Sequence, residues 1–252
     1  MKRLSIIIFS VLFSATAVWS VEHEGQSSWT LKGRVGYNIG GTAPIGMPAT
    51  IRKLNKFELK PNFSLGLDVQ KNFWGKWGLQ GGVRLENKGM GIDATVKSYY
   101  MDLVRGGQSL DGRFTGRVKT DVTQYMFTIP VSATFQPSAS VLLYAGPYLS
   151  ILTRKDFDGY VYNGYLRKGN PTGEKVEMGD DDGSRGYYEF ENDMRPLQFG
   201  INVGADWRVW QRFGLYANLS WGLTGVFKSD FKTVEQTLYP IYGTIGITYQ
   251  IK

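Results

Sequence analysis

Residues 197–208 read Leu-Gln-Phe-Gly-Ile-Asn-Val-Gly-Ala-Asp-Trp-Arg, and the side chains of this stretch alternate between two kinds. Odd-numbered positions are apolar, and even-numbered positions are polar or glycine. A period of two places the two kinds on opposite faces of a β-strand. The stretch therefore predicts a strand with one apolar face and one polar face.

The same alternation recurs along the chain in eight runs, of which several reach eleven residues. A strand that crosses a bilayer at a tilt needs about 9–11 residues. We therefore expect an all-β fold, an eight-stranded antiparallel transmembrane β-barrel. The runs cover residues 29–39, 63–70, 79–86, 125–135, 141–151, 197–208, 213–221 and 239–251.

The connections between these runs are alternately short and long, which is the asymmetry of an outer-membrane barrel with short periplasmic turns and long extracellular loops. An even strand count then places both termini in the periplasm. Residues 92–103 and 113–122 look partly extended, so the second long connection is expected to lengthen its flanking strands. The short connections are 70–78, 136–140 and 209–212, and the long ones are 40–60, 88–121, 153–194 and 223–238.

Residues 122–153 contain no charged side chain, which raises the alternative of a transmembrane helix. Three prolines, Pro130, Pro137 and Pro147, interrupt the segment, and its apolar residues alternate. A β-hairpin is the better interpretation. Proline cannot donate to a strand ladder, so bulges or local distortion are expected at Pro130 and Pro147.

A soluble, lipocalin-like barrel would show the same alternation with the apolar face inside. Three features favour the membrane instead: an apolar face almost free of charge, aromatic residues near strand ends, and a polar face rich in glycine. The aromatic residues are Trp29, Tyr37, Phe73, Trp74, Trp77, Trp207, Trp210, Trp221, Tyr239 and Tyr249, and the glycines are Gly36, Gly66, Gly82, Gly200, Gly204 and Gly246.

The polar face also carries charged residues, which an eight-stranded barrel would bury in its narrow lumen. Buried charges must be paired, and the two signs are nearly balanced. We expect a structural ion network that fills the lumen; a gated ion path is the alternative. The cations are Lys32, Arg34, Arg84 and Arg208, and the anions are Asp68, Glu86 and Asp206.

The N-terminus resembles a secretory signal peptide. Lys2 and Arg3 precede an apolar segment over residues 4–17, and Ser20 offers a small residue for cleavage. We expect a signal peptide over residues 1–20 and an outer-membrane barrel domain over residues 21–252; a single membrane anchor is the alternative. The net charge of +7 is spread without a basic run, so nucleic acid is a poor candidate partner.

Catalytic chemistry has little support in the sequence. The chain has no cysteine and one histidine, His23, which lies just after the expected cleavage site, so a histidine-dependent triad is disfavoured. Asp180, Asp182, Ser184 and Glu191 have offsets like those of a calcium loop, but Arg185 stands where such a loop needs glycine. We predict no catalytic, cofactor-binding or metal-binding residues and no enzyme activity; a loop-borne hydrolase using carboxylates is the least favoured alternative.

The third long connection is rich in aromatic residues, and two interpretations remain open. The rings either form a platform that recognises a glycan or a protein, or they pack over the mouth of the barrel. The residues are Tyr160, Tyr162, Tyr165, Tyr187, Tyr188 and Phe190.

Several motifs resemble the PorT-type outer-membrane barrel family of the Bacteroidetes. They are, in order, residues 79–89 with the Lys88-Gly89 pair, residues 125–131 with an Ile-Pro element, residues 145–150 with a Gly-Pro element, and residues 221–224. The last strand, residues 244–251, resembles the insertion signal read by the barrel-assembly machinery, although the chain ends in Lys252 instead of an aromatic residue.

The resemblance implies an outer-membrane protein in contact with lipid and lipopolysaccharide. It also implies a possible secretion-system partner, because the family's namesake takes part in type IX secretion. We therefore expect a non-enzymatic barrel whose extracellular loops bind or scaffold an unknown partner. An accessory role in transport or protein secretion is the alternative.

Overall fold

The computed structural model describes residues 29–252 except 47, 232 and 235, and it does not describe the side chain of Trp74. The expected signal peptide and His23 lie outside the described residues. The strands are β1 (Thr30–Pro44), β2 (Ile51–Leu59), β3 (Phe63–Trp74), β4 (Trp77–Arg105), β5 (Gln108–Ser138), β6 (Val141–Lys168), β7 (Lys175–Met178), β8 (Gly186–Glu189), β9 (Leu197–Trp210), β10 (Phe213–Gly222) and β11 (Leu238–Gln250), with one 3-10 turn, η1 (Glu191–Asp193).

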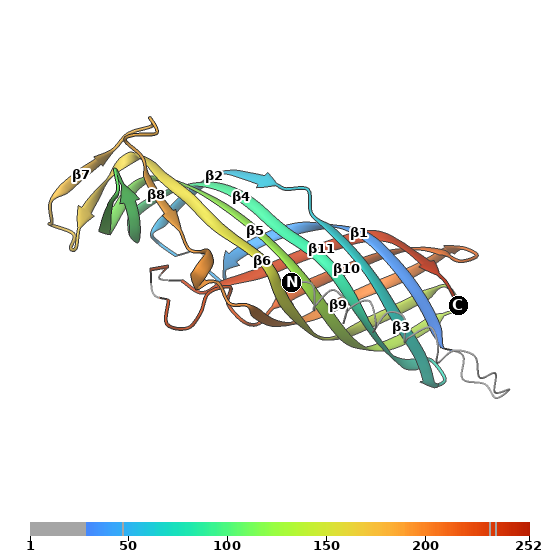
Figure 1. The fold of residues 1–252 in the computed structure, drawn as a ribbon. Helices are drawn as coiled ribbons and strands as arrows, with labels where there is room; N and C mark the ends of the chain where they lie inside the picture. The colour runs from blue at the N-terminus through green and yellow to red at the C-terminus, as the bar shows by residue number, and fades with distance from the viewer. Residues whose placement is uncertain (1–28, 47, 232, 235) are drawn as a thin grey trace, which may run out of the picture.

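Eight of these strands close into a barrel. The antiparallel neighbours run β1, β3, β4, β5, β6, β9, β10 and β11, and β11 pairs back onto β1, with Val35 opposite Ile247. Each of the eight alternating runs lies in one strand of this ring, so the predicted fold class is confirmed. Figure 1 shows the barrel as a tilted cylinder with the C-terminus at one end.

The short and long connections lie at opposite ends of the barrel, as expected, but three of the long ones are mostly strand: 40–60, which contains β2, 88–121 and 153–194. β4 and β5 continue through the connection 88–121 to a tight turn, which confirms the expected lengthening. β6 continues in the same way to Lys168, although we expected a loop after residue 152. These three strands project well beyond the barrel wall (Figure 1).

Of the bulges or local distortion that we expected at the hairpin prolines, only a local distortion is found, a gap in the ladder at residues 131 and 132. The register of β5 against β6 stays constant from Ile129–Leu149 to Ala133–Ala145, on either side of Pro130 and Pro147. The ladder is instead interrupted without a shift, because proline offers no N–H for the missing bonds. The hairpin prediction for residues 122–153 is confirmed. No helix among the described residues is long and apolar enough to cross a membrane.

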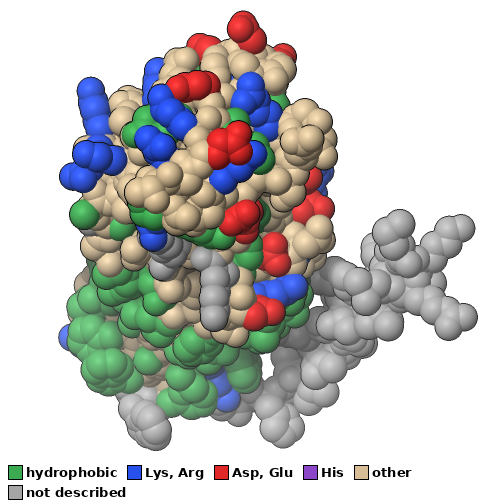
Figure 2. Space-filling model, turned by 90° about the vertical axis from the view of Figure 1, so that its left-hand side faces the viewer, with side chains coloured by type: hydrophobic (Ala, Val, Ile, Leu, Met, Phe, Trp, Pro, Cys, Tyr) green, Lys and Arg blue, Asp and Glu red, His purple; other side chains and the backbone are tan. Residues whose placement is uncertain are grey.

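The barrel wall is apolar outside and polar inside. Val35, Leu65 and Ile245 are more than half exposed, whereas Arg34, Asp68 and Asn202 are almost fully buried. This sense is the reverse of a soluble ligand-binding barrel, so the lipocalin-like alternative is wrong. Figure 2 shows hydrophobic side chains gathered over the lower part of the molecule and charged side chains over the upper part.

The strands that project beyond the wall form an extension with a hydrophobic core of its own. β4, β5 and β6 form its sheet, β2 pairs with one edge of that sheet through β4, and β7 and β8 pair with β6. Apolar side chains fill the concave face together with the residues on either side of η1, Phe190 and Met194, and residues of the connection after β10. The core includes Met90, Met101, Leu103, Phe114, Val122, Phe157, Val161, Leu166, Tyr188, Phe190, Met194, Val226 and Phe227.

Candidate functional site

The lumen is occupied by an ion network centred on Arg34. The Arg34 guanidinium forms ion pairs with Asp68 of β3 and, at 2.9 Å, with Asp206 of β9. Lys32 pairs with the same Asp206 carboxylate at 3.3 Å, and Arg84 lies 3.8 Å from Asp68. The side chains of Arg34 and Asp68 are 1% and 0% exposed, so this network is a buried one, as the sequence predicted.

Tyrosine rings enclose two of the lumen cations. The Arg34 guanidinium lies 5.0 Å from the ring centre of Tyr144 and 4.9 Å from that of Tyr216. Higher in the barrel, Lys88 lies 5.6 Å from the ring centres of both Tyr148 and Tyr242. Such contacts stabilise a desolvated cation through the electron-rich faces of the rings.

Lys88 is a lumen residue that we did not expect from the sequence, although its position could have shown this. Lys88 continues the inward alternation of Arg84 and Glu86 along β4, and its ammonium pairs with Glu86 at 3.4 Å. Glu86 also accepts hydrogen bonds from Ser64 and Thr128. Lys88 and Glu86 therefore form a second layer of charged side chains inside the barrel, in addition to the layer around Arg34.

Glycines make room for the lumen tyrosines. A Cβ atom at Gly36 would lie 2.2 Å from the hydroxyl of Tyr216, and one at Gly204 would lie 2.4 Å from the ring of Tyr144. The free space near Arg84 and Asn202 is only about 10 Å³, which holds about one water molecule. The lumen is thus filled by side chains, in agreement with the expected use of small residues opposite large ones.

Arg208 does not join the lumen network in which we expected it. Its side chain is exposed, and Nη2 donates a hydrogen bond to the carbonyl oxygen of Ala139 at 2.6 Å. Arg208 lies two residues beyond Asp206, near the end of β9, where its side chain reaches solvent and its charge needs no partner. It lines a pocket of about 460 Å³ at the short-turn end of the barrel.

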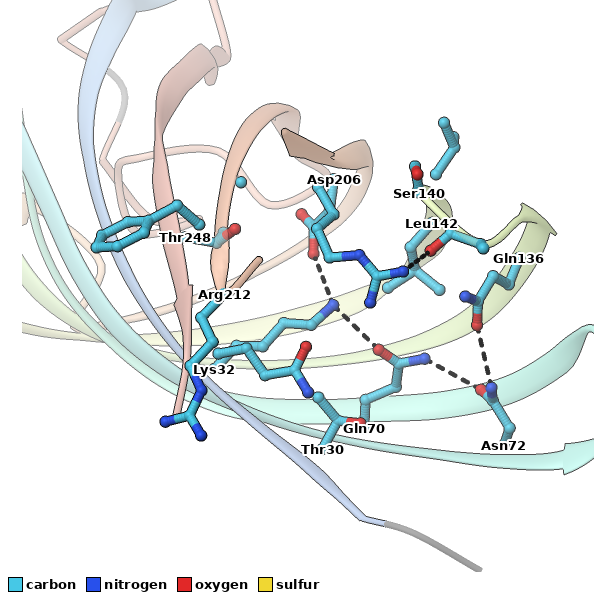
Figure 3. A pocket seen from close by; sticks show the side chains of 16 residues that line it. Thr30, Lys32, Gln70, Asn72, Gln136, Ser140, Leu142, Asp206, Arg212 and Thr248 are labelled. Carbon is cyan, nitrogen blue, oxygen red and sulfur yellow. Dashed lines mark hydrogen bonds and ion pairs between the residues drawn. The ribbon is translucent and has the colours of Figure 1, made fainter. Parts of the chain in front are cut away.

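This pocket is lined mainly by polar side chains from the ends of the barrel strands (Figure 3). A chain of hydrogen bonds runs along its lining: Lys32 donates to Gln70 at 3.2 Å, Gln70 to Asn72 at 3.0 Å, and Asn72 to Gln136 at 3.2 Å.

On the opposite end, Asp93 organises the outer face of the extension. It accepts two hydrogen bonds from Arg117, one from Tyr162 and one from Asn55 of β2. Burial works against the charge on Asp93, but these donors outweigh it and hold the pKa of the Asp93 carboxyl below its ordinary value. Burial and the bond to Asp93 raise the pKa of Tyr162 to about 12.

Next to Asp93, three tyrosines and three cations form what we call the tyrosine–cation surface, made of Arg117, Lys119, Tyr160, Tyr162, Arg185 and Tyr187. The rings of Tyr160 and Tyr162 are 5.5 Å apart, and those of Tyr160 and Tyr187 are 6.1 Å apart. Arg185 lies over the Tyr160 ring at 4.4 Å, and Arg117 over the Tyr162 ring at 5.0 Å.

The aromatic residues of the third long connection thus divide between the two expected roles. Tyr188 and Phe190 are buried in the core of the extension, where their rings stack 5.2 Å apart. Tyr160 and Tyr187 face outward and are partly exposed. Alternation along β8 explains the division, because adjacent residues of a strand point to opposite faces.

The loop with calcium-like offsets is held by an arginine. Arg185 pairs with Asp180 at 3.0 Å and with Asp182 at 2.7 Å. Ser184 instead donates to the carbonyl oxygen of Asp181, and Glu191 lies on η1. Within the described part of the chain, no group of three or more acidic or histidine side chains is placed to hold a metal ion.

Comparison with known proteins gives a family match and several distant likenesses in structure. No curated protein matches the chain. Among solved structures, the attachment invasion locus protein Ail of Yersinia pestis, in complex with the heparin analogue sucrose octasulfate, is 11% identical with a TM-score of 0.39, covering 90% of this chain and 100% of Ail. Neisserial surface protein A is 10% identical with a TM-score of 0.35, covering 90% of this chain and 100% of its own.

The family model described as "Outer membrane protein beta-barrel domain" matches residues 22–228, which is most of the chain. The closed ring of eight strands, the apolar outer wall and the filled polar lumen agree with that description. This protein belongs to the outer membrane protein β-barrel domain family.

Proposed function

We propose that this protein is a non-enzymatic outer-membrane barrel whose extension binds a partner outside the cell through the tyrosine–cation surface. The observation that carries the proposal is the arrangement of the outward-facing rings of Tyr160 and Tyr187, with the buried ring of Tyr162 beside them, around fixed cations on a sheet with its own core. Tyrosine provides a large contact area at low cost in side-chain entropy, and both tyrosine and arginine are enriched where proteins bind partners. The core beneath keeps the surface in one conformation before binding.

The proposal places the extension outside the cell and both termini in the periplasm, after removal of residues 1–20. Short turns on the periplasmic side and long outer segments are the usual arrangement of bacterial barrels. Trypsin added to intact cells is expected to cut near Lys168 and Lys175 and to spare Lys76 in the turn between β3 and β4. Cleavage at Lys76 alone would reverse the orientation.

A photo-crosslinking amino acid in place of Tyr187 tests the binding surface directly. Tyr187 is 41% exposed, so the probe reaches a bound partner without disturbing the core. Irradiation of intact cells is expected to give one crosslinked product of defined mass. The matched control places the probe at Leu215, an exposed residue of the barrel wall that faces lipid. Position 187 giving no product beyond that of position 215 would refute the proposal.

An accessory role in protein secretion is the second candidate, because the chain resembles the PorT-type family. Because side chains fill the lumen, the protein would serve secretion by binding another component of the machine and not as a channel. The crosslinked product separates the two candidates: a component of an envelope machine supports secretion, and an extracellular molecule supports an autonomous binder.

A further inference from the structure

Lys71 is a cation on the lipid-facing wall of the barrel. It belongs to the outward row of β3, between Leu67 and Phe73, and it lies opposite Leu79 of β4. The side chains of Leu67, Phe73 and Leu79 are exposed, as those of lipid-facing residues are. A charge is costly in hydrocarbon, so a lysine in such a row extends its ammonium toward the membrane surface.

Two aromatic rings fix the position of this ammonium. The Lys71 Nζ atom lies 4.7 Å from the ring centre of Trp29 and 5.4 Å from that of Phe73. Both rings are about half exposed and stand near strand ends, where aromatic residues mark the level of the lipid headgroups. Lys71 forms no ion pair with a carboxylate in the described part of the chain. Its charge is therefore held at headgroup level without a protein anion beside it.

The short-turn end of the barrel, where Lys71 lies, also carries other cations. Lys76, Arg208 and Arg212 are exposed in its turns and strand ends, and Arg212 is directed away from the pocket (Figure 3). Among the residues that the structure describes, every exposed carboxylate side chain lies at the other end, on the extension or on the connections beside it. The surface around Lys71 therefore has a positive potential that attracts anions.

We propose that Lys71 binds the phosphate of an anionic phospholipid in the leaflet at the short-turn end, which is the periplasmic leaflet in the orientation proposed above. The acyl chains lie against the apolar wall beside Leu67 and Leu79, and the rings of Trp29 and Phe73 hold the ammonium at the level of the phosphate. Phosphatidylglycerol has no cation of its own, whereas the choline group of phosphatidylcholine already neutralises its phosphate. Coulomb attraction near the low-dielectric wall therefore favours the anionic lipid.

Competition between two lipids with identical acyl chains, phosphatidylglycerol and phosphatidylcholine, tests the proposal. Native mass spectrometry of the purified full-length barrel in detergent gives the ratio of their association constants, and phosphatidylglycerol is expected to bind at least about fivefold more tightly. Lys71→Gln should lower this ratio about fivefold, which corresponds to about 1 kcal/mol for one cation near an anionic surface. Lys71→Arg keeps the charge and should keep the ratio.

Lys175→Gln is the matched control. Lys175 also lies over an aromatic ring, 4.5 Å from the ring centre of Tyr165, but it belongs to β7 on the extension, away from the lipid-facing wall. Its substitution should leave the ratio unchanged. Heat-modifiable gel mobility shows that each variant is folded before lipid is added.

A ratio close to one in the unmodified protein, or an unchanged ratio in Lys71→Gln, would overturn the proposal. An equal fall in Lys175→Gln would also overturn it, because the preference would then follow the total charge of the protein and not a site at Lys71. The lipid ratio is measured without a partner and in either orientation. Its failure is therefore distinct from failure of the crosslink at position 187 or of the trypsin experiment.

Discussion

The guanidinium of Arg34 and the carboxylate of Asp206 lie 2.9 Å apart inside the barrel, although 172 residues separate them in the sequence. The contact crosses the lumen from β1 to β9. The ion network therefore connects β1 to β9, two strands that are not neighbours in the closed ring.

Removal of Arg34 is expected to destabilise the barrel strongly, because it leaves the carboxylates of Asp68 and Asp206 buried without their main partner. Breaking a buried ion pair from one side costs about 3–5 kcal/mol, so Arg34→Met should lower the free energy of unfolding by about that amount. Urea unfolding in lipid vesicles measures the change. Arg212→Met, at the exposed rim, is the control and should change stability by less than about 0.5 kcal/mol. A loss below about 1 kcal/mol for the Arg34 variant would contradict the assigned role of the network.

The ring of Tyr144 is expected to leave no room for a side chain at position 204. Gly204→Ala places a Cβ atom 2.4 Å from that ring and 2.6 Å from the carbonyl oxygen of Ala217, and overpacking of this kind costs about 1–3 kcal/mol. Tyr144→Ala in the same chain should reduce the additional cost of the alanine. Gly243→Ala is the matched control, since its nearest contact would be at 3.7 Å. Similar unfolding midpoints for the two alanine variants would refute the steric argument.

The intact barrel is expected to conduct no steady ion current. Arg34 and Lys88 with their tyrosines form two charge layers across the lumen, and the free space beside Arg84 and Asn202 holds about one water molecule. Planar-bilayer recording of the purified protein should show a silent membrane at either polarity. Stable conductance steps that scale with protein insertion would exclude a plugged lumen and restore the gated ion path.

The contact between Asp93 and its donors is expected to survive mild acid. Because the pKa of Asp93 is lowered in the folded protein, the stability it contributes is complete above its ordinary value of 3.8 and is lost only as the pH falls through the lowered value. Carbon-13 titration of the Asp93 carboxyl should give a midpoint below 3.8. Tyr162→Phe removes one donor and should move the midpoint upward. A midpoint at or above 3.8 in the unmodified protein would show that the donors do not hold the charge.

The alternation of residues along the chain is by itself enough to determine most of the barrel. In the stretch 197–208 it sets the strand and its two faces, and the lack of charge on the apolar face shows which side meets lipid. These are local properties, because a side chain's face depends only on its position along its own strand. The same local rule, extended beyond Glu86, places Lys88 in the lumen.

Tertiary structure alone decided which residues meet. Arg34 reaches Asp68 and Asp206 because the closure of β1 against β11 and the stagger of the strands set the height of each residue in the lumen. Arg208, two residues from Asp206, falls into the open mouth for the same reason. The core of the extension also depends on the curl of β4, β5 and β6 beyond the wall. Contacts across a closed sheet combine the registers of many strand pairs, and no single stretch of sequence contains them.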